Sequence, residues 1–167
     1  YANPAHERRV RDILLEMAPN LSVSISAEVC PEIREFERFT TTTANAYVRP
    51  LMSSYLGRLQ QRLDALGMQC PALLMTSGGG LTTLETARQF PIRLVESGPA
   101  GGAILATQIA SELALDKVIS FDMGGATAKI CMIENQMAGK AREFEVDRRA
   151  RFMKGSGLPL RIPVIEM

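Results

Sequence analysis

The stretch VISFDMGGATAK, residues 118–129, limits the possible folds of this chain more than any other feature. An apolar run ends at an aspartate, two glycines follow, and the chain then returns at once to residues that favour strands. Two such runs joined by a short glycine-containing turn predict a β-hairpin. We expect Val118, Ile119 and Phe121 on its first strand to be buried.

The tip of this hairpin has two interpretations. One is an ordinary Asp-x-Gly-Gly turn, stabilised by local hydrogen bonds of the aspartate. The other is a site for phosphate and its metal ion. A carboxylate at a strand end, here Asp122, can hold Mg²⁺ through water, while glycine N–H groups and a threonine hydroxyl contact phosphate oxygens. The candidates for these phosphate contacts are Gly124, Gly125 and Thr127.

The rest of the chain alternates between helical and strand patterns. We expect a helix that begins at Pro4, with Asn3 as its N-cap, and ends before Pro19, and then a half-buried strand over 21–26. A long amphipathic helix over 44–66 should end at Gly67, and a buried strand over 72–75 follows. Strand, helix and strand predict a right-handed βαβ unit and hence an α/β fold.

Further elements are expected before and after this unit. They are an irregular, β-leaning stretch over 30–43, a glycine-rich turn over 76–81, a helix over 83–90, an extended segment over 92–96 and two β-leaning stretches around Phe144 and Ile162. Ser97 is the predicted N-cap of a helix from Ala100 to about Leu115.

Two more glycine clusters allow two interpretations each. The turn over 76–81 could bring backbone N–H groups close to an anion, but a tight turn that needs positive φ is the simpler explanation. Small residues over 100–106 let a second backbone approach the helix closely, either at a crossing between two lobes or at a close helix–sheet contact.

Composition excludes several classes of function. Lysine and arginine number 19 against 18 acidic residues, so the net charge creates no electrostatic field that would favour binding to nucleic acid or an anionic membrane. The basic stretch 148–154 is short and interrupted by apolar residues. No apolar run reaches the roughly 18 residues of a membrane span, and we see no secretory leader. His6 is the only histidine, so the chain alone can build neither a histidine-rich metal centre nor a serine–histidine triad.

Two more expectations follow, one from the three cysteines and one from the two ends of the chain. Cys30, Cys70 and Cys131 are widely spaced in apolar surroundings, which predicts free thiols in a reducing compartment and a cytoplasmic location. The chain opens at Tyr1 directly before a helix start and stops at Met167 after a strand-like stretch, and we therefore expect a fragment of a longer protein.

The order of the later elements resembles the second lobe of the actin, sugar kinase and heat-shock chaperone ATPase superfamily. There a "connect 1" helix of small residues precedes the "phosphate 2" hairpin. Five blocks in order are similar to the hydantoinase A/oxoprolinase family, which includes β-type subunits of acetone and acetophenone carboxylases. These blocks are NPAHERRV, SAEVCPEIREFERFTTTTANAYVRPLM, LLMTSGGGL, ESGPAGGA and FDMGGATAK.

The resemblance implies an actin-like ATPase fold with two ribonuclease-H-like lobes. Residues 1–96 would then be the end of the first lobe, 97–116 the crossing helix, and 117–167 the start of the second lobe. The implied cofactors are ATP and Mg²⁺. The implied site residues are Asp122 for catalysis and the metal, and Gly124, Gly125, Thr127, Ser97 and Gly98 for the cofactor.

The implied activity is ATP-dependent opening of a cyclic amide, such as a hydantoin, N-methylhydantoin or oxoproline, through a phosphorylated intermediate. A B-type hydantoinase subunit or domain is the implied partner. Alternatives are an ATP-dependent ketone carboxylase subunit, a non-catalytic actin-like binding module, and a sugar or acetate kinase fragment that would share only the fold.

Two departures from the family pattern bear on activity. Ala126 stands where the family usually has a hydroxyl residue. The amino-terminal Asp-x-Gly-Gly-Thr hairpin and the glycine-rich segment that the family carries beyond Met167 are not in this sequence, so we expect the chain alone to be inactive. Lys129 is common at its place in the family, but its role stays open, as does that of 34–43.

Overall fold

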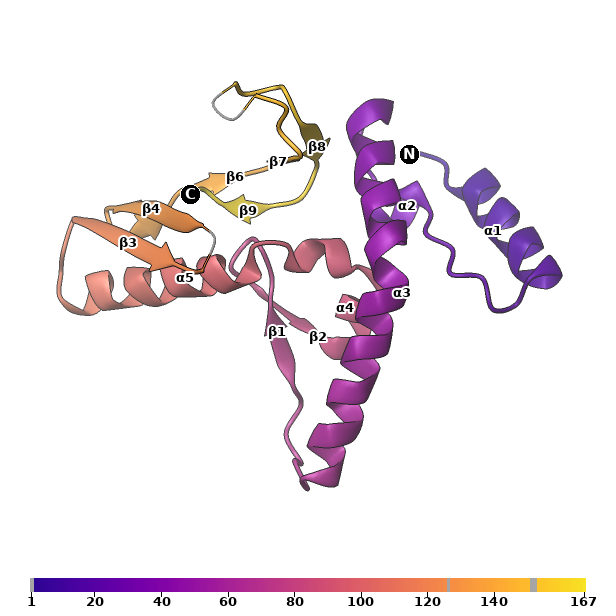
Figure 1. Cartoon of the computed structure of the whole chain (residues 1–167), viewed down its shortest axis with the longest axis horizontal. Coiled ribbons are helices and arrows are strands. Elements are labelled where there is room, and N and C mark those ends of the chain that lie inside the picture. The colour runs from indigo at the N-terminus through magenta and orange to yellow at the C-terminus, as the bar shows by residue number, and fades with distance from the viewer. Residues whose placement is uncertain (1, 126, 151–152) are drawn as a thin grey trace.

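The computed structural model describes residues 2–125, 127–150 and 153–167 and has a mixed α/β fold. The longest element is α3, which stands between α1 and α2 on one side and β1, β2 and α5 on the other (Figure 1). The elements are α1 (Ala5–Met17), α2 (Ser26–Val29), α3 (Glu35–Ala65), β1 (Leu73–Met75), β2 (Leu81–Thr83), α4 (Leu84–Gln89), the 3₁₀-helix η1 (Pro91–Leu94), α5 (Ser97–Glu112), β3 (Lys117–Met123), β4 (Ala128–Glu134), β5 (Met137–Ala138), β6 (Lys140–Ala141), β7 (Phe144–Val146), β8 (Leu158–Leu160) and β9 (Val164–Ile165).

Four small sheets are formed by the described residues, and every strand pair in them is antiparallel. The predicted hairpin is confirmed, because β3 pairs with β4 along its whole length. The predicted βαβ unit is wrong. Residues 21–25 form no strand, and β1 pairs antiparallel with β2.

The glycine-rich turn over 76–81 explains this antiparallel pairing. The N–H of Thr76 donates to the carbonyl oxygen of Gly80 at 2.8 Å, which folds the chain back into a hairpin. A Cβ on Gly78 would lie 3.2 Å from Cβ of Pro163, and one on Gly79, whose φ is +79°, would lie 2.8 Å from Cδ1 of Ile104. Close packing therefore accounts for Gly78, and close packing with positive φ accounts for Gly79, in line with the simpler interpretation.

The long helix begins earlier than predicted, since α3 includes the threonine run. The hydroxyls of Thr40, Thr41 and Thr42 donate to carbonyl oxygens four residues earlier, at 2.6–2.8 Å. These bonds satisfy the hydroxyls within the helix, so the stretch 30–43 is not β-like as expected. Gly67 ends the helix as predicted: its φ is +75°, and the N–H of Met68 donates to Leu63 in a Schellman motif.

The segment before α5 also differs from the prediction. Residues 92–96 are not extended, because Pro91 starts a 3₁₀-helix that runs to Leu94. The residue that precedes α5 is Glu96, in the left-handed conformation at φ 60°, and Ser97 is already the first helical residue and not its N-cap.

Helix α5 packs its small residues against the hairpin. Ala100, Ala103 and Ala110 are fully buried in one cluster with Cys131 and Ile133 of β4. This confirms the close helix–sheet contact that the small residues predicted.

Only one face of the hairpin is covered by α5. Val118 is half-buried, whereas Ile119 and Phe121 are 68% and 59% exposed, so their predicted burial is wrong. They alternate with the helix-facing residues, and no described element covers the opposite face of β3 and β4.

Two expectations from composition are tested by the described residues. The three cysteines are free; Cys30 and Cys131 are buried and Cys70 is exposed. No helix in the described parts of the chain combines the length and apolar character that a membrane span requires.

Candidate functional site

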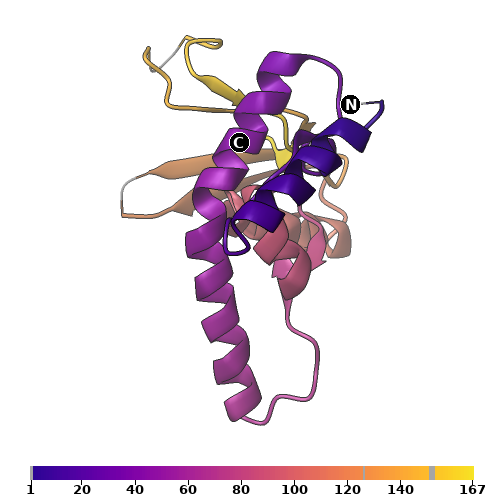
Figure 2. The same cartoon turned by 90° about the vertical axis from the view of Figure 1, so that its right-hand side faces the viewer.

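The candidate site begins at the hairpin tip. Asp122 is exposed at the end of β3, in register with Lys129 on β4. Its side chain makes no hydrogen bond or ion pair with any described residue. The tip is closed by the N–H of Gly124, which donates to the carbonyl oxygen of Thr127 at 2.9 Å. The hairpin extends away from the body of the molecule (Figure 2), so the Asp122 carboxylate is available to a ligand.

The two tip glycines are not required by the turn itself. Neither has a φ in the left-handed region. A Cβ on Gly125 would meet nothing within 4 Å, and one on Gly124 would meet only the Thr127 carbonyl oxygen at 3.8 Å. Neither left-handed backbone conformation nor packing therefore demands glycine at these two positions. Ala126 lies outside the described residues.

One ion pair connects this hairpin to α5. Nζ of Lys129 lies 3.0 Å from Oε1 of Glu96, with the two side chains 27% and 24% exposed. The same ammonium lies 6.0 Å from the ring centroid of Phe144. Sequence reasoning missed Glu96, because an ion pair between residues so far apart in the chain leaves no local pattern.

The N-terminus of α5 offers free backbone donors. The first helical bond runs from the N–H of Ala100 to the carbonyl oxygen of Glu96 at 3.1 Å, and no side chain caps this end. The N–H groups of Ser97 and Gly98 precede the first intrahelical donor, and a Cβ on Gly98 would meet nothing within 4 Å. A helix N-terminus with open donors favours an anion.

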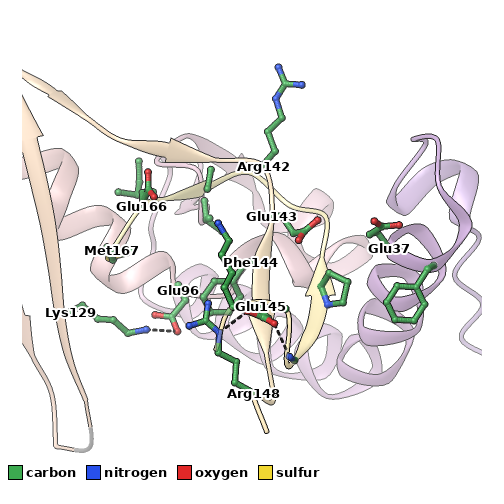
Figure 3. Close-up of a pocket in the computed structure, with 18 residues that line it drawn as sticks. Glu37, Glu96, Lys129, Arg142, Glu143, Phe144, Glu145, Arg148, Glu166 and Met167 are labelled. Carbon is green, nitrogen blue, oxygen red and sulfur yellow. Dashed lines mark hydrogen bonds and ion pairs between the residues drawn. The ribbon is translucent and has the colours of Figure 1, made fainter. Parts of the chain in front are cut away.

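A cavity of about 690 Å³ adjoins the ion pair. Figure 3 shows Lys129 and Glu96 in its wall, beside Phe144 and the pair Glu145–Arg148. Its charged lining is mixed, with the acids Glu37, Glu96, Glu143, Glu145 and Glu166 and the bases Lys129, Arg142, Arg148 and Lys154. The six residues predicted for the site do not line it: they are Asp122, Gly124, Gly125, Thr127, Ser97 and Gly98.

Glu145 is held in place at the cavity wall. Its carboxylate accepts the N–H of Gly157 at 2.7 Å and the Nε–H of Arg148 at 2.7 Å. The Gly157 bond is the largest cause that lowers the pKa of Glu145, and Arg148 adds to it against the effect of desolvation. Arg148, at the start of the basic stretch 148–154, therefore forms an ion pair with Glu145. Residues 151 and 152 of this stretch lie outside the described residues.

The tip is compatible with Mg²⁺ only in the presence of phosphate. No group of three or more histidine, cysteine, aspartate or glutamate side chains that could hold a metal occurs among the described residues. Mg²⁺ in phosphate-transfer sites is commonly bound by one or two carboxylates, with water and substrate phosphates completing the shell. The single carboxylate of Asp122 fits that arrangement and does not fit an all-protein metal site.

Comparison with known proteins gives a consistent result. A family model described as hydantoinase/oxoprolinase matches residues 38–167. An uncharacterized protein of Methanocaldococcus jannaschii is 40% identical over 100% of this chain and 25% of its own length. The caprolactamase subunit alpha of Pseudomonas jessenii is 35% identical over 78% of this chain and 19% of its own length.

A solved structure shares the fold. It is the nucleotide-free structure of acetone carboxylase, from a study of ATP-dependent acetone carboxylation, with a TM-score of 0.76 and 26% sequence identity. The match covers 98% of this chain and 22% of that chain. The chain therefore spans a quarter or less of each of these three relatives.

Proposed function

Because the chain belongs to the hydantoinase/oxoprolinase family, we propose that it is the central part of a longer enzyme that opens a cyclic amide with ATP. The candidate substrates are hydantoin, N-methylhydantoin and 5-oxoproline. The name of the Pseudomonas relative supports this class, since caprolactam is also a cyclic amide. Residues 1–96 would end a first actin-like lobe, 97–116 cross between lobes, and 117–167 begin the second.

The observation that carries the proposal is the open hairpin tip. Asp122 is exposed and makes no bond with the described residues, and the two glycines beside it are required neither by strain nor by packing. In our proposal Asp122 holds Mg²⁺ through water, and the N–H groups of Gly124 and Gly125 donate to phosphate oxygens. The Thr127 hydroxyl adds a further contact.

The helix N-terminus would act together with the tip. The N–H groups of Ser97 and Gly98 present a positive dipole end to an anion. The Glu96–Lys129 pair fixes the return strand against this end of α5, so the two sets of donors keep one relative position. Bound ATP would supply the phosphoryl group that activates the amide or carbonyl.

A second candidate is an ATP-dependent ketone carboxylase subunit. The structural similarity to acetone carboxylase over 98% of the chain favours it. Both candidates use the same phosphate site and differ in the carbon substrate. In either case a partner subunit of the B type is proposed, in line with the relative that is named as a subunit.

The experiment is a comparison of substrates. The longer protein that carries this chain, purified with its partner, is assayed for ATP-dependent phosphate release with hydantoin, N-methylhydantoin, 5-oxoproline or caprolactam, and with acetone plus bicarbonate. Turnover with a cyclic amide alone supports the first candidate, and turnover that needs both acetone and bicarbonate supports the second. Absence of ATP use with every substrate would contradict both. The 167-residue chain by itself should hydrolyse no ATP, because one hairpin cannot enclose the phosphates and exclude water.

A further inference from the structure

Arg38 on α3 is a largely buried cation whose Nε has no hydrogen-bond partner among the described residues. Its residue is 8% exposed. No carboxylate of the described residues lies within ion-pair distance of its guanidinium, which instead lies 5.0 Å from the ring centroid of Phe39. A buried charge without a hydrogen-bonded partner is strongly unfavourable. Arg38 therefore points to an acceptor that is bound from outside.

A cavity of about 460 Å³ lies beside Arg38, where α1, the segment before α2 and α3 meet. Its walls are largely apolar. The apolar lining residues are Val10, Leu14, Val23, Ile25 and Phe39. An apolar cavity with a largely buried cation in its wall favours a ligand that has an apolar body and a single charge of opposite sign.

The other charged groups of this cavity have local partners. The Glu7 carboxylate accepts the Ser26 hydroxyl at 2.9 Å and the N–H of Ala27 at 2.9 Å. Burial acts to raise the pKa of Glu7, but these hydrogen bonds and the charge of Arg38 outweigh it and lower the pKa. Arg11 donates to Glu28 at 2.8 Å. Glu7 and Arg11 therefore bind partners within the fold, whereas the Nε of Arg38 makes no hydrogen bond with the described residues.

We propose that this cavity binds a small aliphatic carboxylate, with its carboxylate on the guanidinium of Arg38 and its chain among the apolar residues. The planar fork of arginine matches a carboxylate in geometry and charge. The ligand's aliphatic body would cover Val10 and Leu14 of α1, which are 56% and 38% exposed. The cavity shares no lining residue with the one beside Lys129 and contains none of the six residues proposed for the ATP site, so the proposal stands apart from that site.

The test is calorimetric titration of the longer protein that carries this chain with hexanoate and with hexanamide, its uncharged analogue. We expect hexanoate to bind and hexanamide to bind about tenfold more weakly or not at all, since only the carboxylate forms charge-assisted bonds. Arg38→Met should weaken hexanoate binding by about tenfold or more. The matched control is Arg9→Met, because Arg9 lies on the same α1–α3 side of the chain but is 66% exposed and outside the cavity.

Thermal unfolding supplies a second readout. Hexanoate should raise the Tm of the unchanged protein and of Arg9→Met, but not that of Arg38→Met. Without ligand, Arg38→Met should fold and stay close to the unchanged protein in stability, because it removes a largely buried charge together with the favourable effect of that charge on Glu7. Failure of hexanoate to bind, equal binding of hexanamide, unchanged binding to Arg38→Met, or unfolding of that variant would each overturn the proposal.

Discussion

Nζ of Lys129 lies 3.0 Å from Oε1 of Glu96 and ties the return strand of the hairpin to the residue before α5. Both side chains are partly buried, so Lys129→Met should lower the free energy of unfolding by about 1 kcal/mol, near the upper end for accessible ion pairs. Urea denaturation of the two proteins measures this loss of unfolding free energy. The control is Glu16→Gln, which breaks a pair with Arg9 that is about two-thirds exposed. Equal losses in the two variants would show that the Lys129 pair is an ordinary surface contact.

Thiol labelling should separate Cys70 from the other two cysteines. Cys70 is exposed, whereas Cys30 and Cys131 are buried, and desolvation raises the pKa of both buried thiols. We expect one thiol per chain to react quickly with a disulfide reagent under native conditions and three in denaturant. Cys70→Ser should abolish the fast reaction. Fast reaction of a second thiol would contradict the burial of Cys30 or of Cys131.

Asn45 joins α3 to three other segments. Its Nδ2 donates to Ser24 Oγ and to the Gln89 carbonyl oxygen, each at 3.1 Å, and its Oδ1 accepts the N–H of Ile92 at 3.3 Å. Asn45→Ala leaves buried groups without partners and should cost about 3 kcal/mol of unfolding free energy. Thr43→Ala, exposed on the same helix, should leave stability unchanged or slightly higher. A loss below about 1 kcal/mol for Asn45→Ala would mean that water replaces these bonds.

Stability should fall in acid partly through Glu7. Its pKa in the folded chain lies below the ordinary value of about 4.3. A depressed carboxyl pKa contributes stability above the unfolded pKa, and this contribution is lost as pH falls through the folded pKa. Between about pH 5 and pH 3, the unchanged chain should therefore lose more unfolding free energy than Glu7→Gln. Parallel losses would assign the acid sensitivity to other carboxyls.

The parts of the fold that sequence could predict depend on local chemistry. The hairpin 118–133, the C-cap at Gly67 and the helix 83–90 follow from patterns that lie within a few residues, and the structure confirms them. The βαβ unit was wrong because strand pairing depends on which segments meet, and the turn at 76–80 sends β1 into an antiparallel pair.

In the candidate site, too, the sequence identifies residues that are close in the chain and misses contacts between distant ones. The residues of the hairpin tip could be named from their spacing, although their roles as ligands stay predictions. The Glu96–Lys129 pair could not be named, because it joins two elements that only the tertiary fold brings together. The burial of Arg38 could not be predicted from the sequence either, since a run of charged residues on a helix is usually solvated.

The central claim is that Asp122 holds the metal ion of a bound nucleotide, and Asp122→Asn in the longer enzyme tests it most directly. The amide keeps the size and much of the hydrogen bonding but removes the charge. The control is Asp116→Asn, an exposed aspartate just before β3, at the opposite end of the hairpin from its tip. Circular dichroism and thermal unfolding check that both variants fold.

The measurement is ATP turnover at saturating Mg²⁺. We expect Asp122→Asn to lower kcat by about a hundredfold, which corresponds to about 3 kcal/mol of transition-state stabilisation, and Asp116→Asn to stay close to the unchanged enzyme. Turnover near that of the unchanged enzyme in folded Asp122→Asn, with its Mg²⁺ dependence intact, would contradict the claim and leave the hairpin tip as a plain turn.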